Sequence, residues 1–206
     1  CIDVRCLGSR SATRKTGCRV VTRSRIAVVQ MTSSMEVEVN LTKLSELFVD
    51  LMATSVDAIF LPENFAAFGT LGCLEIGRDE LSEPSRIRSF LAEQAVALDC
   101  CIFAGTVPLA ARPDGVRVEE DRVRAASLVF DQQGKQIARY DKIHLFDVDV
   151  NDNQQRYRES DRFEAGNTLE VVESPIGAVG LSVCYDIRFP EMYRDLVLAG
   201  AEILAV

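Results

Sequence analysis

An alternation of short apolar runs and amphipathic stretches fills the first half of the chain and most constrains its fold. Apolar runs typical of buried strands lie at residues 26–31, 58–61 and 100–107. Between them, apolar side chains recur at helical spacing over about 36–54, and again along a stretch that begins near Pro84. A strand–helix–strand–helix–strand order predicts an α/β layered domain around a largely buried sheet.

The second half of the chain predicts hairpins, loops and one more helix. Turn residues at 131–134 and at 175–177 each separate two apolar stretches and indicate two β-hairpins. The polar stretches 111–122 and 147–166 predict loops, and the second is long enough to be functional. A helix over 190–199 and a final strand are expected to follow.

The stretch from Gly180 to Glu191 contains Cys184, the side chain best suited to take part in a chemical reaction. An apolar run ends at this cysteine, and Pro190 suits the first turn of a helix because its missing N–H has no partner there. We therefore predict a buried strand, a sharp turn that carries Cys184, and a helix. Backbone N–H groups at a helix start favour a thiolate, which makes Cys184 a candidate nucleophile.

Three polar residues, Glu63, Lys142 and Cys184, stand at the ends of apolar strands. Strand ends are where sites assemble in layered α/β folds, so the three can converge. A carboxylate can take the proton of a cysteine, and an ammonium group favours the thiolate and stabilises an oxyanion. Together they predict attack on a carbonyl or nitrile carbon, a thioester intermediate, loss of an amine, and release of the acid by water.

Each of these residues also has an ordinary structural explanation. Cys184 would more often be an inert buried cysteine, Glu63 a helix-capping carboxylate and Lys142 a surface residue. The single histidine, His144, lies two residues from Lys142 and would have to serve any cysteine–histidine pair. We expect His144 to be structural or solvent-facing instead.

Composition limits the classes of function. No apolar run approaches the roughly 18 residues of a membrane span, so we expect no membrane role. Of the 23 basic and 31 acidic residues, seven basic and one acidic lie in residues 1–25, which leaves residues 26–206 with a net charge of −14. A body so acidic argues against a nucleic-acid partner, which requires a positive surface.

The basic, acid-poor segment 1–24 has the composition of a transit segment, and its alternative is an unstructured tail or sequence upstream of the true start. We leave it outside the predicted fold and assign the domain to residues 25–206. The expected location is cytoplasmic, or mitochondrial or another organelle if the segment is a transit peptide.

The cysteines predict neither disulfides nor a metal site. Outside residues 1–24 they are Cys73, Cys100, Cys101 and Cys184. Their spacing matches neither a disulfide framework nor a CxxC pair, which favours a reducing compartment. With one histidine and no cluster of ligands, a metal site has little support.

Three segments together resemble the signature segments of the nitrilase superfamily of carbon–nitrogen hydrolases. They are Leu61–Asn64, Arg139–Asp147 and Gly180–Glu191, in the family's order and separation, and the similarity runs over residues 25–206. The resemblance implies an α-β-β-α sandwich. It also implies no metal or organic cofactor, and a homodimer that pairs through the sandwich.

The resemblance also implies roles for particular residues. Glu63 would be the general base, Lys142 the oxyanion stabiliser and Cys184 the nucleophile, while the backbone N–H of Tyr185 would complete the oxyanion hole. Many family members have a further glutamate near the site from the segment before the first hairpin. Glu119 or Glu120 are the candidates for it here.

Within the superfamily, Asp186–Glu191 and Asp147–Val150 most resemble the Nit branch, particularly the deaminated glutathione amidases. These remove an amide end from a small peptide-like 2-oxo acid amide, and omega-amidase or nitrilase are the alternative activities. Arg188 is then a candidate to hold a substrate carboxylate with paired hydrogen bonds. Its alternative role is to pair with Glu191 or Asp186 and brace the turn.

Family members usually continue beyond the position of Val206. We therefore expect a C-terminally incomplete sandwich with exposed apolar sheet and an unpaired edge. This motivates an alternative of another class, a non-catalytic nitrilase-like domain that acts by binding or by joining a partner's sheet.

Overall fold

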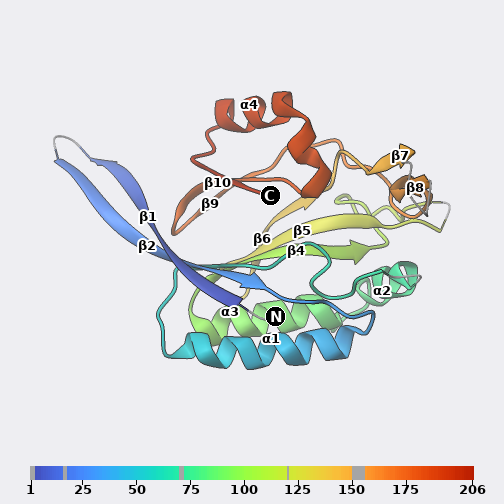
Figure 1. Cartoon of the computed structure of the whole chain (residues 1–206), viewed down its shortest axis with the longest axis horizontal. Coiled ribbons are helices and arrows are strands. Elements are labelled where there is room, and N and C mark those ends of the chain that lie inside the picture. Colours follow the sequence, from blue (N-terminus) through green and yellow to red (C-terminus); the bar gives the residue numbers. More distant parts are fainter. Residues whose placement is uncertain (1–2, 16–17, 70–71, 120, 150–155) are drawn as a thin grey trace.

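A computed structural model describes residues 3–15, 18–69, 72–119, 121–149 and 156–206 of the chain (Figure 1). The described strands are β1 (Asp3–Lys15), β2 (Cys18–Gln30), β3 (Ala58–Phe60), β4 (Cys101–Leu109), β5 (Arg124–Phe130), β6 (Gln136–Asp141), β7 (Asp147–Asp149), β8 (Arg156–Arg158), β9 (Val171–Ser174), β10 (Gly177–Leu181) and β11 (Ile203–Ala205). The described helices are α1 (Val37–Met52), α2 (Cys73–Asp79), α3 (Arg86–Leu98) and α4 (Pro190–Leu198), with the 3-10 turns η1 (Glu159–Asp161) and η2 (Cys184–Arg188).

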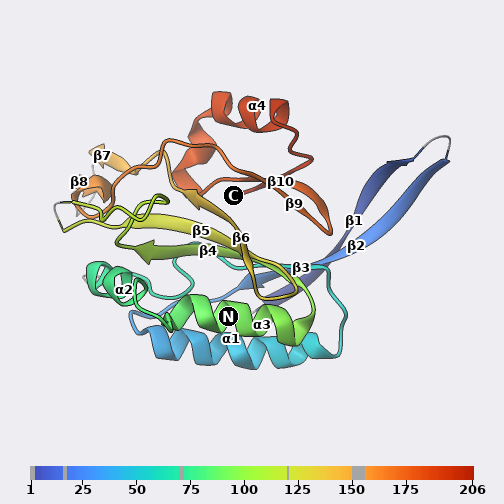
Figure 2. The same cartoon turned by 180° about the vertical axis from the view of Figure 1, so that it is seen from behind.

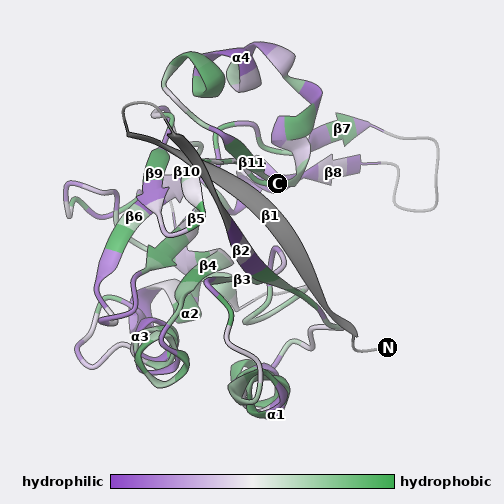
Figure 3. Ribbon diagram, turned by 90° about the vertical axis from the view of Figure 1, so that its left-hand side faces the viewer, coloured by the Kyte–Doolittle hydropathy of each residue, from purple (hydrophilic) through white to green (hydrophobic). Residues whose placement is uncertain are grey.

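The strands form two main sheets that lie between layers of helix. The large sheet has the order β1-β2-β3-β4-β5-β6, and the small sheet has the order β11-β10-β9. Helices α1 and α3 cover the outer face of the large sheet, and α4 lies beyond the small sheet (Figures 1 and 2). Figure 3 shows these layers from the side, with α1 and α3 at the bottom and α4 at the top. The predicted α-β-β-α sandwich is therefore confirmed.

Burial on both faces explains why the central strands are largely apolar. Every residue of β5, and all but one residue of β4, is buried. Successive residues of β4 alternate between two cores: Ile102 belongs to the core under α1 and α3, and Phe103 to the core between the two sheets. The core between the sheets also takes Tyr140 from β6 and Leu181 from β10, so it joins the two halves of the sandwich.

The large sheet mixes parallel and antiparallel pairs. Strand β3 runs parallel to both β2 and β4, as the crossover helices α1 and α3 require. Strands β4, β5 and β6 then run antiparallel, through the predicted hairpin. In the small sheet β9 is antiparallel to β10, while β11 is parallel to it after the crossover through α4.

Three regions differ from the expectations. Strand β2 begins at Cys18 and pairs with β1, so most of the segment 1–24, which we left outside the fold, lies in a hairpin that projects from the large sheet (Figure 1). The transit role of this segment stays a prediction. Helix α2 was missed, because seven residues are too few to show a periodic pattern. The predicted loop 147–166 contains the small β7–β8 pair and η1.

An ion-pair cluster fixes the segment after η1 to the end of the large sheet. Glu164 accepts two hydrogen bonds from Arg112, at 2.8 and 2.7 Å, and pairs with Arg124 of β5. Arg124 also donates to the carbonyl of Ala165. The hydrogen bonds from Arg112 above all, with the charge of Arg124, lower the pKa of Glu164 from 4.5 to about 2 against the opposing effect of burial.

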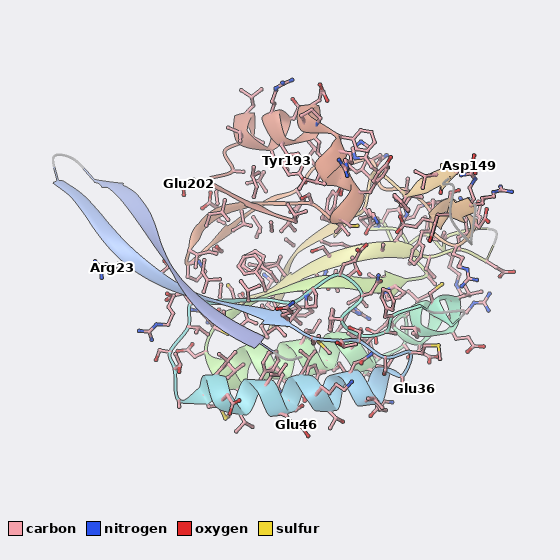
Figure 4. The ribbon with its side chains drawn as sticks, viewed as in Figure 1. Arg23, Glu36, Glu46, Asp149, Tyr193 and Glu202 are labelled. Atoms are coloured by element: carbon pink, nitrogen blue, oxygen red, sulfur yellow. The ribbon has the colours of Figure 1, made fainter. Side chains whose placement is uncertain are left out.

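Glu164→Gln is expected to lower the free energy of unfolding at pH 7 by about 2 kcal/mol, the scale of hydrogen bonds to a charged group. Because the folded-state pKa lies below the ordinary value, this stabilisation is present above about pH 4.5 and is lost as the pH falls towards 2. Urea unfolding of both proteins from pH 7 to pH 3 measures it. The control is Glu46→Gln on the exposed outer side of α1 (Figure 4). A difference that stayed constant across this range would contradict the assignment.

Candidate active site

Glu63, Lys142 and Cys184 arrive at one place from three strand ends. Glu63 lies three residues after β3, Lys142 follows β6 directly, and Cys184 opens η2 shortly after β10. The Lys142 Nζ donates a hydrogen bond to Glu63 Oε1 at 3.1 Å, and the same carboxylate is near enough to the Cys184 thiol to raise its pKa. The structure therefore brings the three side chains together, with Glu63 between the ammonium group and the sulfur.

The segment that carries Glu63 packs closely against β4 because residue 105 of that strand is a glycine. A Cβ added at Gly105 would lie 1.9 Å from the carbonyl oxygen of Pro62, so only glycine allows this approach. The neighbouring Thr106 hydroxyl accepts a hydrogen bond from the Asn64 N–H at 2.8 Å. Asn64 itself has a φ of 55°, in the left-handed region that asparagine tolerates better than most residues. Local backbone geometry thus sets the direction of Glu63.

Cys184 also lies in the left-handed region, with a φ of 47°. Such a backbone costs a non-glycine residue roughly 1–3 kcal/mol, and it persists only where the surroundings hold it. Here β10 enters from one side and η2 leaves on the other, so the turn presents the cysteine at the surface of the molecule, where it is exposed. The predicted sharp turn at the end of a buried strand is present.

A second glutamate, Glu159, completes the surroundings of Lys142. Its Oε1 accepts a hydrogen bond from Lys142 Nζ at 2.9 Å, and its Oε2 accepts one from the Phe146 N–H at 2.7 Å. The Lys142 side chain is 2% exposed. Burial alone would lower its pKa, but the charges of Glu63 and Glu159 outweigh burial and raise it above 10.5. Lys142 is therefore a buried ammonium ion.

The resting form of Cys184 is the thiol. Although Cys184 is exposed as a residue, partial desolvation of its sulfur and, after it, the negative charge of Glu63 raise its pKa above 9.0, while the charge of Lys142 acts in the opposite direction. We expected N–H groups at a helix start to favour the thiolate, and this was wrong. The turn η2 is a single five-residue 3-10 turn, and partial desolvation with the charge of Glu63 raises the pKa of the thiol. The thiol consequently needs a base, and Glu63, which lines the same cavity, is the carboxylate beside it.

A cavity of about 240 Å³ lies beside the sulfur. Glu63 and Cys184 are among its polar lining, and Phe60 and Phe103, whose rings stack at 4.4 Å, contribute to its apolar walls. Ser127 of β5 adds a hydroxyl. The cavity has room for a small organic molecule next to the thiol and the carboxylate.

The residues on either side of the cysteine turn form an aromatic group. The ring of Tyr185 meets Phe146 and Phe189 edge-on, with centroids 5.0 and 5.6 Å apart. The ring of His144 stacks on Phe189 at 3.6 Å. These contacts hold Tyr185 beside Cys184. The assignment of the Tyr185 backbone N–H to an oxyanion hole stays a prediction.

The remaining predicted residues lie elsewhere. Arg188 is exposed at the end of η2, and in the described part of the chain it pairs with neither suggested carboxylate: Glu191 pairs with Arg194, and Asp186 binds His144. The role of Arg188 in binding a carboxylate stays a prediction.

The structure brings Glu159 to Lys142, and not either glutamate suggested from the sequence. Glu119 is exposed and acts electrostatically on Arg112, while Glu120 lies outside the described residues. Glu159 lies in a polar stretch without periodicity, and no feature of its immediate sequence distinguished it.

Two further expectations concern cofactors and membranes. No helix that the structure describes is both long enough and apolar enough to cross a bilayer. Within the described ranges, histidine, cysteine and acidic side chains do not gather into a group of three or more suited to a metal ion. The absence of a cofactor stays a prediction from the family resemblance.

The charges around the sulfur predict how its reactivity changes. Partial desolvation of the sulfur is the main cause of the raised pKa of Cys184, followed by the charge of Glu63, and Glu159 adds to it. Glu159→Gln removes one negative charge, so the thiol pKa falls and alkylation of Cys184 by iodoacetamide at pH 8 is expected to become a few-fold faster. Peptide mass spectrometry measures this rate separately from the other cysteines. With Glu202→Gln as the control, an unchanged or slower rate in Glu159→Gln would contradict the arrangement.

Comparison with known proteins places the chain in a family. Residues 25–206 match the family model of carbon-nitrogen hydrolases. The deaminated glutathione amidase of Yersinia enterocolitica is 33% identical over 181 residues, which cover 88% of this chain and 61% of that protein. The omega-amidase NIT2 of Danio rerio is 29% identical over 187 residues, which cover 89% of this chain and 62% of that protein.

The fold agrees with these matches. The crystal structure of the C. elegans NitFhit protein superposes with a TM-score of 0.73 at 28% identity, over 87% of this chain and 42% of that one. The chain spans less than two thirds of the length of the curated relatives it matches. The family model covers nearly the whole chain and includes all three motif segments, and the chain therefore belongs to the carbon-nitrogen hydrolase family, as their resemblance to the nitrilase superfamily predicted.

Proposed function

We propose that this protein hydrolyses the amide carbon–nitrogen bond of a small molecule that carries a carboxylate, with Cys184 as the nucleophile. The observation that carries the proposal is the carboxylate of Glu63, which accepts a hydrogen bond from the Lys142 ammonium group at 3.1 Å, raises the pKa of the Cys184 thiol and lines a cavity with it. Membership of the carbon-nitrogen hydrolase family supports it. The names of the matched relatives, which are amidases, favour an amide over a nitrile.

In the first half of the reaction, Glu63 takes the proton of the Cys184 thiol while the sulfur attacks the carbonyl carbon of the amide. The carbonyl oxygen becomes an oxyanion, which the Lys142 ammonium group and the backbone N–H of Tyr185 stabilise. When the intermediate collapses, the carbon–nitrogen bond breaks and the amine leaves with the proton that Glu63 held. The product that remains on the enzyme is a thioester of Cys184.

In the second half, Glu63 takes a proton from water, whose oxygen attacks the thioester carbon. The carbon–sulfur bond then breaks, the carboxylic acid leaves, and the proton returns from Glu63 to the Cys184 sulfur. Glu159 takes no proton in this scheme. Its part is to hold the Lys142 ammonium group, which it contacts at 2.9 Å.

The substrate we propose is a small 2-oxo acid amide of the kind that deaminated glutathione amidases use. A cavity of about 240 Å³ with apolar walls suits a molecule of this size. Arg188, on the turn that carries Cys184, is the proposed partner of its carboxylate. Omega-amidase activity on a shorter 2-oxo acid amide is the alternative, and the name of the Danio rerio relative supports it.

Cys184→Ala is expected to abolish turnover, and Cys184→Ser to lower kcat by at least about a thousandfold, because a hydroxyl is a far weaker nucleophile. The measurement is amine release from a panel of 2-oxo acid amides of different length. The control is Cys73→Ala, which removes a buried cysteine that does not line the cavity. Turnover that persisted in Cys184→Ala would refute the mechanism. No turnover by the unmodified chain would favour the non-catalytic domain.

A further inference from the structure

We propose that Asp186 is a positioning residue that fixes Cys184 relative to Lys142 across the two sheets. Its consequence for turnover rests on the proposed function. Its consequence for the reactivity of the sulfur does not, because that can be measured without any substrate.

The Asp186 carboxylate is fully buried and accepts hydrogen bonds on both oxygens. Its Oδ1 accepts one from the His144 N–H at 3.0 Å and lies 2.7 Å from Nδ1 of the same residue. Its Oδ2 accepts one from the Tyr140 hydroxyl at 2.7 Å and one from the Val183 N–H at 2.8 Å. A buried carboxylate is tolerated when its lone pairs are occupied in this way.

The hydrogen-bond partners of Asp186 lie close to Lys142 and Cys184 in the sequence. Tyr140 and His144 lie two residues before and two residues after Lys142, and Val183 immediately precedes Cys184. One carboxylate thus contacts the chain on both sides of the lysine and the residue next to the cysteine.

These contacts cross from one sheet to the other. Tyr140 belongs to β6 of the large sheet, while Val183 follows β10 of the small sheet. Backbone ladders set the register of strands within a sheet, but no ladder joins two stacked sheets, so side chains must set their relative position. Tyr140 is 1% exposed, and its pKa is raised, first by burial and then by the hydrogen bond to Asp186, so it remains a neutral donor.

Aromatic packing holds the histidine of this group in place. The His144 ring lies parallel to Phe189, with centroids 3.6 Å apart and planes 9° apart. Phe189 is the N-cap of α4, so the stack also joins the segment after Lys142 to the helix after Cys184. His144 contacts Asp186 and Phe189, which is the structural role expected for it.

Asp186→Asn keeps the size of the side chain but replaces one acceptor oxygen with an N–H₂ group. That group must face at least one backbone N–H, either of Val183 or of His144, and the two donors repel. The turn that carries Cys184 then moves relative to Lys142. Displacements of about 1 Å at a reacting centre cost on the order of a hundredfold in rate.

The experiment compares the full chain with Asp186→Asn in three measurements: kcat and KM on an amide that the wild type hydrolyses, the pH profile of Cys184 alkylation, and the melting temperature. We expect kcat to fall by about a hundredfold with KM changed less than about threefold. The sulfur also leaves the carboxylate that raises its pKa, so the midpoint of the alkylation profile moves down towards 9.0.

The matched control is Tyr193→Phe. Its hydroxyl is hydrogen-bonded to Ser182 Oγ at 2.9 Å, next to Val183, and lies on the side of α4 that faces the small sheet (Figure 4). Tyr193 lies in α4 and Ser182 follows β10, so this hydrogen bond does not join the small sheet to the large one. We expect Tyr193→Phe to lower the melting temperature while kcat and the alkylation midpoint stay at their wild-type values.

The outcomes separate this inference from the proposed function. A wild-type kcat and alkylation midpoint in Asp186→Asn would overturn the positioning role alone, and so would the same losses in Tyr193→Phe. If the wild type hydrolyses no amide, the alkylation midpoint still decides the role of Asp186. If Asp186→Asn does not fold, Tyr140→Phe removes one of the bonds and keeps the ring. A lowered midpoint is then expected, and an unchanged one overturns the inference.

Discussion

The buried ammonium group of Lys142 is the constraint on which the rest of the site depends. Moving a lysine out of water costs several kcal/mol unless anions compensate. Glu63 and Glu159 compensate here, at 3.1 and 2.9 Å. Two carboxylates around one ammonium leave an excess negative charge, which adds to partial desolvation of the sulfur in raising the pKa of the neighbouring Cys184. The carboxylates that stabilise the buried lysine therefore also favour the protonated form of Cys184, and one of them, Glu63, is in position to act as its base.

The three groups lie on different segments of the fold, and different contacts fix the position of each. Glu63 depends on the close approach of its loop to Gly105, where no side chain fits. Lys142 depends on its two carboxylates. Cys184 lies in η2, after β10 of the other sheet, in a left-handed backbone conformation, and Asp186 joins this turn to β6. The site thus lies where the two sheets meet, and its geometry depends on how the sheets are held together.

The sequence predicted the parts of the fold whose pattern is local. The run 100–107 predicted β4 because a strand covered on both faces is apolar at nearly every position. Leu44 and Phe48 recur at helical spacing and predicted α1. Helix α2 has only seven residues, one of them Gly77, and it leaves no comparable pattern. The pairing of β1 with β2 depends on contacts between segments, which composition does not reveal.

The candidate site was predictable where strand ends carry the polar residue, and not where a loop does. Glu63, Lys142 and Cys184 each follow an apolar run, so their convergence could be expected from topology. Glu159 reaches Lys142 from an irregular segment, so its position depends on the tertiary fold. The raised pKa of Cys184 could not be predicted either, since it depends on desolvation in the fold and on a carboxylate 121 positions away along the chain.

The central claim is that Cys184 carries the acyl group of the substrate between the two halves of the reaction. The most direct measurement is to mix the protein with an amide that it hydrolyses, quench with acid, and determine the masses of the intact protein and its peptides. We expect an adduct equal to the acyl group, without the amine, on the peptide that contains Cys184. Hydrolysis without such an adduct under single-turnover conditions, or an adduct on a different residue, would contradict it.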